Sequence, residues 1–122
     1  MTDLFSQPGT KRYQFFLDHI AESPLVWSLS DDGGIAVSET SDGTSCFSVW
    51  PSDYYAQQCA IEDWADYRPE PIPTDSFVNE WLTDLANAGL MISVFPAPGG
   101  ESVEMPAEAL REEIMKHQNA SE

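Results

Sequence analysis

The feature that most constrains the fold of this chain is a change in the period of its apolar residues. One stripe recurs at i, i+3, i+4 and i+7, the spacing of one face of an α-helix: Tyr13, Phe16, Leu17 and Ile20. Beyond it, from Leu25, apolar and polar residues alternate, as they do in a strand with one buried face. The chain is therefore predicted to combine helices with strands.

We predict the first helix over residues 10–22. Thr10 is a suitable N-cap, because a hydroxyl at that position accepts a hydrogen bond from the first turn. The pair Ser23-Pro24 ends the helix, since the residue before a proline avoids the α region. The helix thus stops where the alternating segment begins.

Three short strands are predicted next, over residues 25–29, 35–38 and 46–50. The first connection is Asp31-Asp32-Gly33-Gly34, a turn because its glycines accept positive φ angles. The second is Ser41-Asp42-Gly43-Thr44, in which an Asp-Gly pair between two extended runs marks a hairpin. The three strands should form an antiparallel meander.

Two helices are predicted after this meander. Ser52 caps the first of them, directly after Pro51 has stopped the third strand. Thr74 caps the second, whose apolar stripe ends at Gly89, a natural helix stop. Between them, residues 67–73 contain three prolines and are expected to be an extended connector.

The end of the chain is predicted to hold a strand and a helix. The fourth strand covers residues 90–95, residues 102–104 form a further short extended piece, and Pro106 opens the last helix. The predicted order is α-β-β-β-α-α-β-α in one α+β domain over residues 1–122. An antiparallel sheet of about four strands should pack with about four helices.

A four-residue echo links two of the predicted strands. Ser48-Val49-Trp50-Pro51 is repeated as Ser93-Val94-Phe95-Pro96. Four residues are too few to define a repeat unit. We therefore interpret the echo as two strands that end alike at one edge of a sheet.

The charge of the chain is strongly negative. It has 21 Asp and Glu residues against 5 Lys and Arg residues, for a formal net charge of −16. Such a surface repels phosphate groups, so we expect no nucleic-acid partner and no binding to anionic lipid. It would attract a basic protein partner. The alternative is that the charge serves only solubility.

No catalytic or metal-binding motif is present. His19 and His117 have no second histidine at ligand spacing, and the two cysteines fit no metal or redox spacing. A cysteine nucleophile needs a histidine base beside it, whereas Cys46 lies on a predicted strand and Cys59 on the buried side of a predicted helix. We expect no cofactor, no metal and no enzymatic activity.

The compartment expected for this chain is the cytoplasm. Residues 1–20 contain several charges and lack the apolar core of a secretory signal. No stretch approaches the ~20 apolar residues that a membrane span requires. Both cysteines are then expected to be reduced thiols.

Four large side chains are candidates for a partner-binding surface: Trp50, Phe95, Met91 and Trp27. If alternate apolar residues of the third and fourth strands face the helices, then Trp50, Met91 and Phe95 point to the other face of the sheet. Large aromatic side chains there mean either that a helix covers this face or that an exposed patch binds a partner. The sequence leaves both alternatives open.

An ordered set of apolar and turn positions resembles a known family. The set is Val26-Trp27, Gly34, Val49-Trp50-Pro51, Ala56, Trp64, Ile72, Phe77, Trp81-Leu82, Leu85, Gly89, Val94-Phe95-Pro96, Val103 and Leu110. This pattern resembles the small bacterial family known as domain of unknown function 2750 and covers most of the chain. The resemblance implies one compact domain in a bacterial cytoplasm. It carries over no activity, cofactor or catalytic residue.

The function expected from these observations is that of a non-enzymatic protein-binding or regulatory module. A specific form is an inhibitor-like or immunity-like protein that neutralises a basic partner. One alternative is a small-molecule sensor, or an enzyme of unrecognised type, with an apolar pocket. Another is a homodimer in which a sheet face or edge forms the interface.

Overall fold

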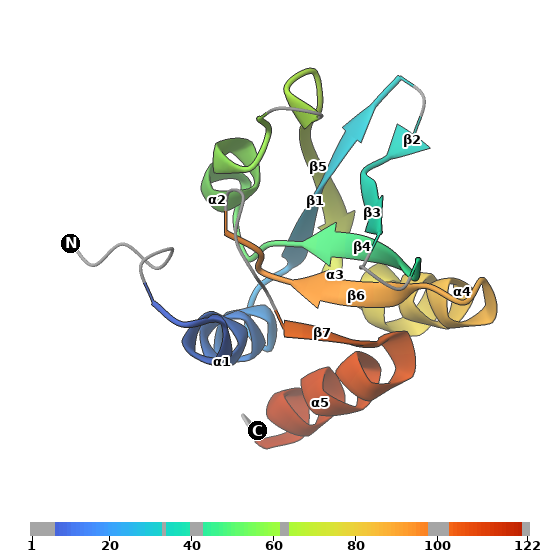
Figure 1. The fold of residues 1–122 in the computed structure, drawn as a ribbon. Coiled ribbons are helices and arrows are strands. Elements are labelled where there is room, and N and C mark those ends of the chain that lie inside the picture. The colour runs from blue at the N-terminus through green and yellow to red at the C-terminus, as the bar shows by residue number, and fades with distance from the viewer. Residues whose placement is uncertain (1–6, 33, 40–42, 62–63, 98–102, 121–122) are drawn as a thin grey trace.

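The structure, a computed structural model, describes residues 7–32, 34–39, 43–61, 64–97 and 103–120. These residues form an α+β fold in which helices flank two small sheets (Figure 1). In chain order the elements are α1 (Gly9–Ile20), β1 (Leu25–Asp31), β2 (Gly34–Ile35), β3 (Val37–Glu39), β4 (Ser45–Val49), α2 (Asp53–Gln58), β5 (Arg68–Pro73), α3 (Thr74–Ser76), the π-helical segment η3 (Phe77–Trp81), α4 (Leu82–Asn87), β6 (Met91–Val94), β7 (Val103–Pro106) and α5 (Ala107–Ala120).

The predicted α+β class is confirmed, but the prediction of one antiparallel sheet of about four strands is wrong. One sheet has the order β2-β1-β5 and the other the order β3-β4-β6-β7. Strands β4 and β6 are parallel, and their arrows point the same way in Figure 1. The reason is the connection between them, which crosses over through α2, β5 and the continuous helix formed by α3, η3 and α4, here called the long helix, before β6 begins.

The predicted meander is divided between the two sheets. β2 pairs with β1 and β3 pairs with β4, both antiparallel, as the turn signals indicated. Ala36 lies between β2 and β3, and its N–H donates to the carbonyl of Leu29 at 2.8 Å. The middle strand therefore leaves one sheet and joins the next. Of the turn residues, Gly33, Ser41 and Asp42 lie outside the described residues.

Residues 68–73, expected to be a connector, form strand β5. β5 is antiparallel to β1 along six residue pairs, from Leu25 opposite Pro73 to Ser30 opposite Arg68. Its prolines occupy alternate positions, at Pro69, Pro71 and Pro73, so all three missing N–H groups fall on one side. Pro71 is opposite Trp27, whose own N–H and carbonyl bond to Trp50, so that side faces away from β1. Because β5 is an edge strand, no ladder hydrogen bond is lost.

The four-residue echo lies in register across the parallel pair. Ser48 is opposite Ser93 and Val49 is opposite Val94. The interpretation that two strands end alike at one sheet edge is therefore confirmed. Trp50 and Phe95 follow directly at that edge.

The helix boundaries follow the predicted signals in part. The Ser52 hydroxyl accepts a hydrogen bond from the Tyr55 N–H at 3.5 Å, as a cap does, and Gly89 has a φ of 80° after the end of α4. Thr10 is not the cap of α1, which begins at Gly9 and has no side-chain cap. Pro106 is the last residue of β7, and α5 begins one residue later.

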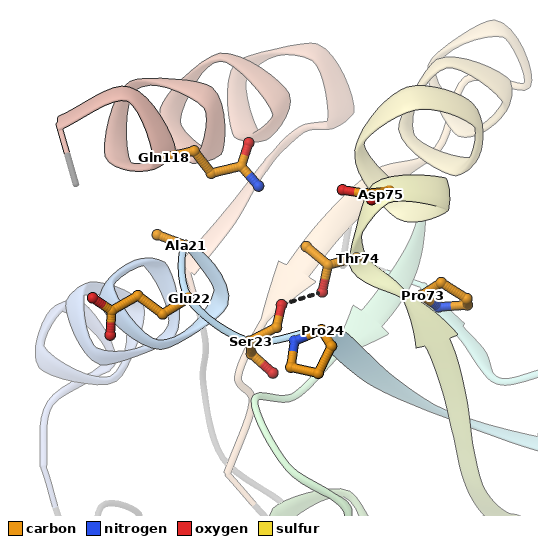
Figure 2. A pocket seen from close by; sticks show the side chains of 8 residues that line it. All are labelled: Ala21, Glu22, Ser23, Pro24, Pro73, Thr74, Asp75 and Gln118. Atoms are coloured by element: carbon orange, nitrogen blue, oxygen red, sulfur yellow. Dashed lines mark hydrogen bonds between the residues drawn. The ribbon is translucent and has the colours of Figure 1, made fainter. Parts of the chain in front are cut away.

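Thr74 also has a different role from the predicted cap. It is the first residue of α3, and its hydroxyl donates to the carbonyl of Ser23 at 2.9 Å (Figure 2). Its N–H donates to the carbonyl of Pro24, also at 2.9 Å. Both bonds join the start of the long helix to the loop that follows α1.

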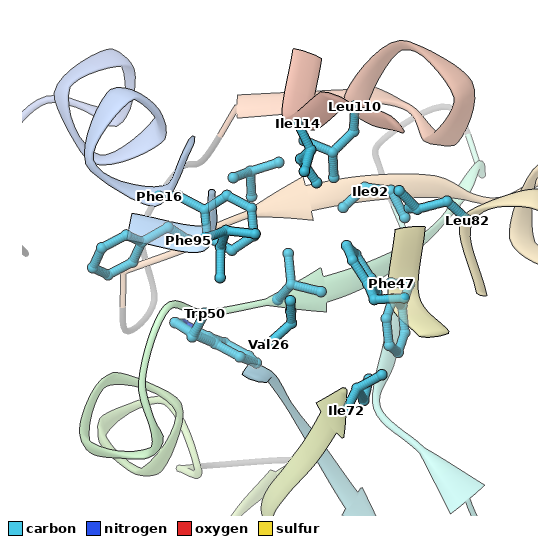
Figure 3. Close-up of a cluster of buried hydrophobic side chains, with 14 of the residues drawn as sticks. Phe16, Val26, Phe47, Trp50, Ile72, Leu82, Ile92, Phe95, Leu110 and Ile114 are labelled. Carbon is cyan, nitrogen blue, oxygen red and sulfur yellow. The ribbon is translucent and has the colours of Figure 1, made fainter. Parts of the chain in front are cut away.

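The buried apolar side chains form one cluster between the sheets and the helices (Figure 3). α1 and α5 pack on the β6–β7 side of the larger sheet, whereas α2 packs against β1 and β5. The predicted stripe of α1 is buried at Phe16, Leu17 and Ile20. Within the part of the chain that the structure describes, no helix combines the length and apolar character needed to traverse a bilayer.

Candidate functional site

The carboxyl ends of β4 and β6 bring two of the predicted partner-binding residues together. Trp50 follows β4 and Phe95 follows β6, and the Phe95 N–H donates to the carbonyl of Val49 at 2.8 Å. In sheets with parallel strands, ligand sites gather at the carboxyl ends of those strands. This edge is therefore one candidate site, and we call it the strand-end cluster: Arg12, Trp50, Cys59, Phe95 and Pro96.

Trp50 and Phe95 are both fully buried and do not form an exposed patch (Figure 3). The Trp50 indole Nε1–H donates to the carbonyl of Pro96 at 3.0 Å, and the ring of Tyr55 packs on that of Phe95 with 4.9 Å between centroids. Of the two alternatives left by the sequence, the covered face applies to these residues. The Ser52 cap starts α2 directly after β4, which brings Tyr55 over the strand ends.

The other two predicted residues are not members of this cluster. Trp27 is half-buried on β1, and two backbone hydrogen bonds of 3.0 and 2.8 Å join it to Trp50. Met91, also half-buried, is the first residue of β6 and so lies at the opposite end of that strand from Phe95. The structure does not unite the four residues in one surface.

A buried arginine and an unusual backbone conformation mark the strand-end cluster. Phe95 has a φ of 53°, in the left-handed region that residues other than glycine seldom adopt. Arg12 is only 3% exposed, and its Nε–H donates to the carbonyl of Phe95 at 2.9 Å. Its Nη1 donates to the carbonyl of Gln7 at 2.6 Å. Arg12 therefore joins α1 to the end of β6 and supports the backbone conformation there.

The thiol in this cluster is not an activated nucleophile. The Cys59 Sγ–H donates to the carbonyl of Pro96 at 3.2 Å. Burial raises the pKa of Cys59 to about 11, while its neighbours Trp50 and Arg12 lower it by less. At neutral pH the group is a protonated thiol, and only a thiolate attacks. Cys46 is buried too, with its Sγ 3.7 Å from Oε2 of Glu104.

We expect Cys59 to resist alkylation. At pH 8 its reaction with iodoacetamide should be roughly a hundredfold slower than that of a cysteine in an unfolded peptide, because almost no thiolate forms below a pKa near 11. Because burial penalises the thiolate, this group leaves stability undiminished at neutral pH and lowers the free energy of unfolding as the pH rises from about 9 to about 11. Peptide mapping by mass spectrometry measures the rate. Rapid labelling of Cys59 in the folded protein would contradict the assignment.

A chain of ring contacts leads from the strand-end cluster to the surface. The ring centroids of Tyr54 and Tyr55 are 5.2 Å apart. Those of Phe15 and Phe95 are 6.2 Å apart, and Phe15 stacks on His19 with 5.7 Å between centroids. Tyr54 is 63% and Phe15 is 37% exposed. We call the surface formed by Phe15, His19, Tyr54 and Tyr55 the aromatic ridge. It spans α1 and α2 above the strand ends.

A second surface feature lies on the long helix, at the opposite end of β6 from α2 (Figure 1). It is a groove of about 430 Å³ lined by Glu80, Trp81, Asp84 and Leu85. Trp81 is half-buried and stacks on Phe47 with 5.7 Å between ring centroids, and Leu85 is buried. Both carboxylates are exposed, four residues apart on one helix face. We call this feature the Trp81 groove.

The backbone under the Trp81 groove departs from a regular α-helix. Residues Phe77–Trp81 form a π-helical turn, a feature that is rare and often occurs at functional sites. The guanidinium of Arg111 on α5 donates from Nε to the carbonyl of Val78 within this turn at 3.1 Å. The π turn sets where Trp81 leaves the helix, and thus how the groove is shaped.

A third hollow, of about 300 Å³, lies where the end of α1, the start of α3 and the end of α5 meet (Figure 2). Its lining includes Glu22, Asp75 and Gln118, whose amide points toward Thr74 in Figure 2. The Thr74 hydroxyl already donates to Ser23. Among the described residues its lining mixes polar side chains with prolines and contains no aromatic ring, so it offers no stacking surface to a ligand.

The described residues contain no cluster of three or more His, Cys, Asp and Glu side chains that could hold a metal ion. His117 on α5 contacts Asp18 on α1, with 3.6 Å between Nε2 and Oδ1. His19 belongs to the aromatic ridge. Neither histidine lies in the strand-end cluster.

The family described as protein of unknown function (DUF2750) matches residues 13–114. The chain belongs to this family. No curated protein and no solved structure matches it. The family assigned from the apolar and turn pattern is thereby confirmed.

Several features of this DUF2750 protein were not predicted from its sequence. Arg12 directly precedes the apolar stripe of α1, and nothing in the sequence distinguishes it from a solvated cation. Phe15 and Tyr54 are aromatic residues outside the buried stripes, a signal that points to the aromatic ridge. For the Trp81 groove the signal is a pair of carboxylates, Glu80 and Asp84, that flank a tryptophan of the stripe.

Proposed function

We propose that this DUF2750 protein is a non-enzymatic binding module that recognises a basic segment of another protein through the Trp81 groove. The observation that carries the proposal is the combination in that groove of an aromatic side wall, a buried leucine and two exposed carboxylates. A lysine or arginine side chain presents an apolar stem and a cationic head, so it matches both parts of this lining.

The charge of the whole protein supports the same proposal. With a net charge of −16, the protein attracts a basic surface from a distance and speeds its encounter. Neither Glu80 nor Asp84 has an ion pair with another described residue. Their charges are therefore free to meet an external cation. An inhibitor-like or immunity-like protein toward a basic partner is the specific form that these features favour.

The two alternative functions have less support. A small-molecule sensor or enzyme needs an enclosed pocket with an apolar lining, whereas both the Trp81 groove and the hollow in Figure 2 are open to solvent. A homodimer through the β5 edge of the smaller sheet would meet three prolines, which offer no N–H donors. On the larger sheet, Cys46, Ser48 and Ser93 are buried rather than open to a second copy.

The test is capture of partners from a lysate of the native host on the immobilised protein, with a salt gradient for elution. We expect a basic protein to be retained and to elute at moderate salt, because screening shortens the range of charge attraction to about 10 Å near 0.1 M. The double variant Glu80→Gln/Asp84→Asn should retain it roughly tenfold less. Mass spectrometry identifies and quantifies the eluted protein.

A matched control is the double variant Glu108→Gln/Glu112→Gln. These residues are also exposed and four apart, on α5, so this variant loses the same charge away from the groove. It should retain the partner almost as well as the wild type. Equal loss in both variants would show a general charge effect and contradict the groove. If only Tyr54→Ser loses retention of the partner, the partner binds at the aromatic ridge and not at the groove.

A further inference from the structure

The chemistry of the Trp81 groove distinguishes between the two basic side chains. We propose that the groove accepts an arginine of the partner in preference to a lysine. This inference rests on the proposed function and names the group that the same surface recognises. Its motivation is the order of the lining, in which Trp81 lies between Glu80 on one side and Asp84 one turn further along the helix.

The ring of Trp81 is held in place for stacking. Phe47 of β4 packs on it, with 5.7 Å between the centroids and an angle of 28° between the planes. This contact fixes the ring on its inner side, while the part that lines the groove is left to a ligand. A guanidinium is planar and stacks on such a ring, and it loses less hydration than an ammonium does.

The carboxylates favour a guanidinium for a second reason. Residues four apart on a helix lie about one turn from each other, so two acceptors stand near the same ring. A guanidinium carries five N–H donors in a rigid fork, so it can stack on Trp81 and still donate to Glu80 and Asp84. An ammonium is a compact point charge and gains less from a ring and two separated carboxylates at once.

The burial pattern also excludes a deep apolar anchor as the occupant. Glu80 and Asp84 are exposed, so an apolar side chain placed between them would desolvate their charges without pairing them. The half-buried Trp81 and the buried Leu85 still give the arginine stem an apolar contact. The occupant that meets both conditions is a side chain with an aliphatic stem and a cationic head.

The experiment is an NMR titration of the purified full chain, uniformly labelled with ¹⁵N, with two capped peptides. One alternates arginine with glycine, and the other has lysine at the same positions and hence the same charge. We expect the arginine peptide to bind about three- to tenfold more tightly, with the largest shifts at the Trp81 indole N–H and the amides around Glu80 and Asp84. Glu80→Gln/Asp84→Asn should abolish these shifts, and Glu108→Gln/Glu112→Gln should not.

Each other outcome overturns a defined part of the inference. Equal affinity for both peptides at the groove would overturn the preference for arginine and leave the proposed function standing. Shifts that stay away from the groove, or that survive in the groove variant, would overturn both. Trp81→Phe should keep the fold and reduce the preference for arginine, and an unchanged preference would contradict the stacking. Light scattering that shows a dimer blocked by Glu80→Gln/Asp84→Asn would make a second copy the occupant.

Discussion

Replacing Trp50 by alanine should lower the free energy of unfolding by about 4 kcal/mol, the largest effect expected of any single substitution proposed for this protein. The indole is fully buried, packs edge-on against Trp64 with 6.3 Å between centroids, and donates to the carbonyl of Pro96 at 3.0 Å. Alanine leaves a cavity where the two sheets meet. Chemical denaturation followed by circular dichroism measures the loss without relying on tryptophan fluorescence.

Two further substitutions separate the causes of this effect. Trp50→Phe keeps a large ring and removes the N–H donor, and the Pro96 carbonyl still accepts from Cys59, so we expect a loss of only about 1–2 kcal/mol. Tyr54→Ala, at a 63% exposed position, should change stability by less than about 1 kcal/mol. A Trp50→Ala protein as stable as Tyr54→Ala would show that the strand ends are not covered in solution.

Replacing Arg12 by methionine should destabilise the protein by about 2–4 kcal/mol. Methionine keeps an unbranched apolar stem but removes the donors to the carbonyls of Phe95 and Gln7. The Phe95 carbonyl belongs to a residue in the left-handed region, so the end of β6 loses its support together with its hydrogen bond. The denaturant midpoint, compared at constant m-value, measures the change.

Arg68→Met is the matched control for Arg12→Met. The Arg68 side chain is 76% exposed and lies 3.5 Å from the carboxylate of Asp32, a pair at the surface that contributes little. We expect a change of less than about 0.5 kcal/mol. Similar small effects in both arginine variants would mean that Arg12 does not hold the strand-end cluster together.

Local signals predicted the elements that depend on local physics. The hydroxyl of Ser52 and the backbone freedom of Gly89 act within a few residues, and both were placed correctly. The echo of Ser48–Pro51 in Ser93–Pro96 gave a correct long-range prediction, since the two strands do lie side by side in register and end together. Its parallel direction depends on the crossover, which no four-residue pattern encodes.

The missed strand β5 has a clear physical cause. Prolines normally argue against a strand, but their alternate spacing in β5 directs every missing donor away from β1. The alternate spacing of these prolines is visible in the sequence, and only the conclusion that the segment is a connector was wrong. In the same way, Thr74 was read as a cap because its type is suited to one, whereas its hydroxyl donates to Ser23 instead.

The candidate sites were harder to predict than the fold. Trp50 and Phe95 were predicted to share one face of the sheet, but their exposure depended on whether α2 folds back over the strand ends, which is a tertiary question. The Trp81 groove depends on the π turn at Phe77–Trp81, for which no sequence signal was recognised. Charge alone predicted a basic partner without a place for it to bind.

The central claim is that a basic partner binds at the Trp81 groove, and calorimetric titration of the purified partner into three forms of the protein tests it most directly. The wild type and Glu108→Gln/Glu112→Gln should give dissociation constants within about twofold of each other. Glu80→Gln/Asp84→Asn should bind roughly tenfold more weakly, with a reduced dependence on salt. Equal dissociation constants for the two double variants would contradict the account.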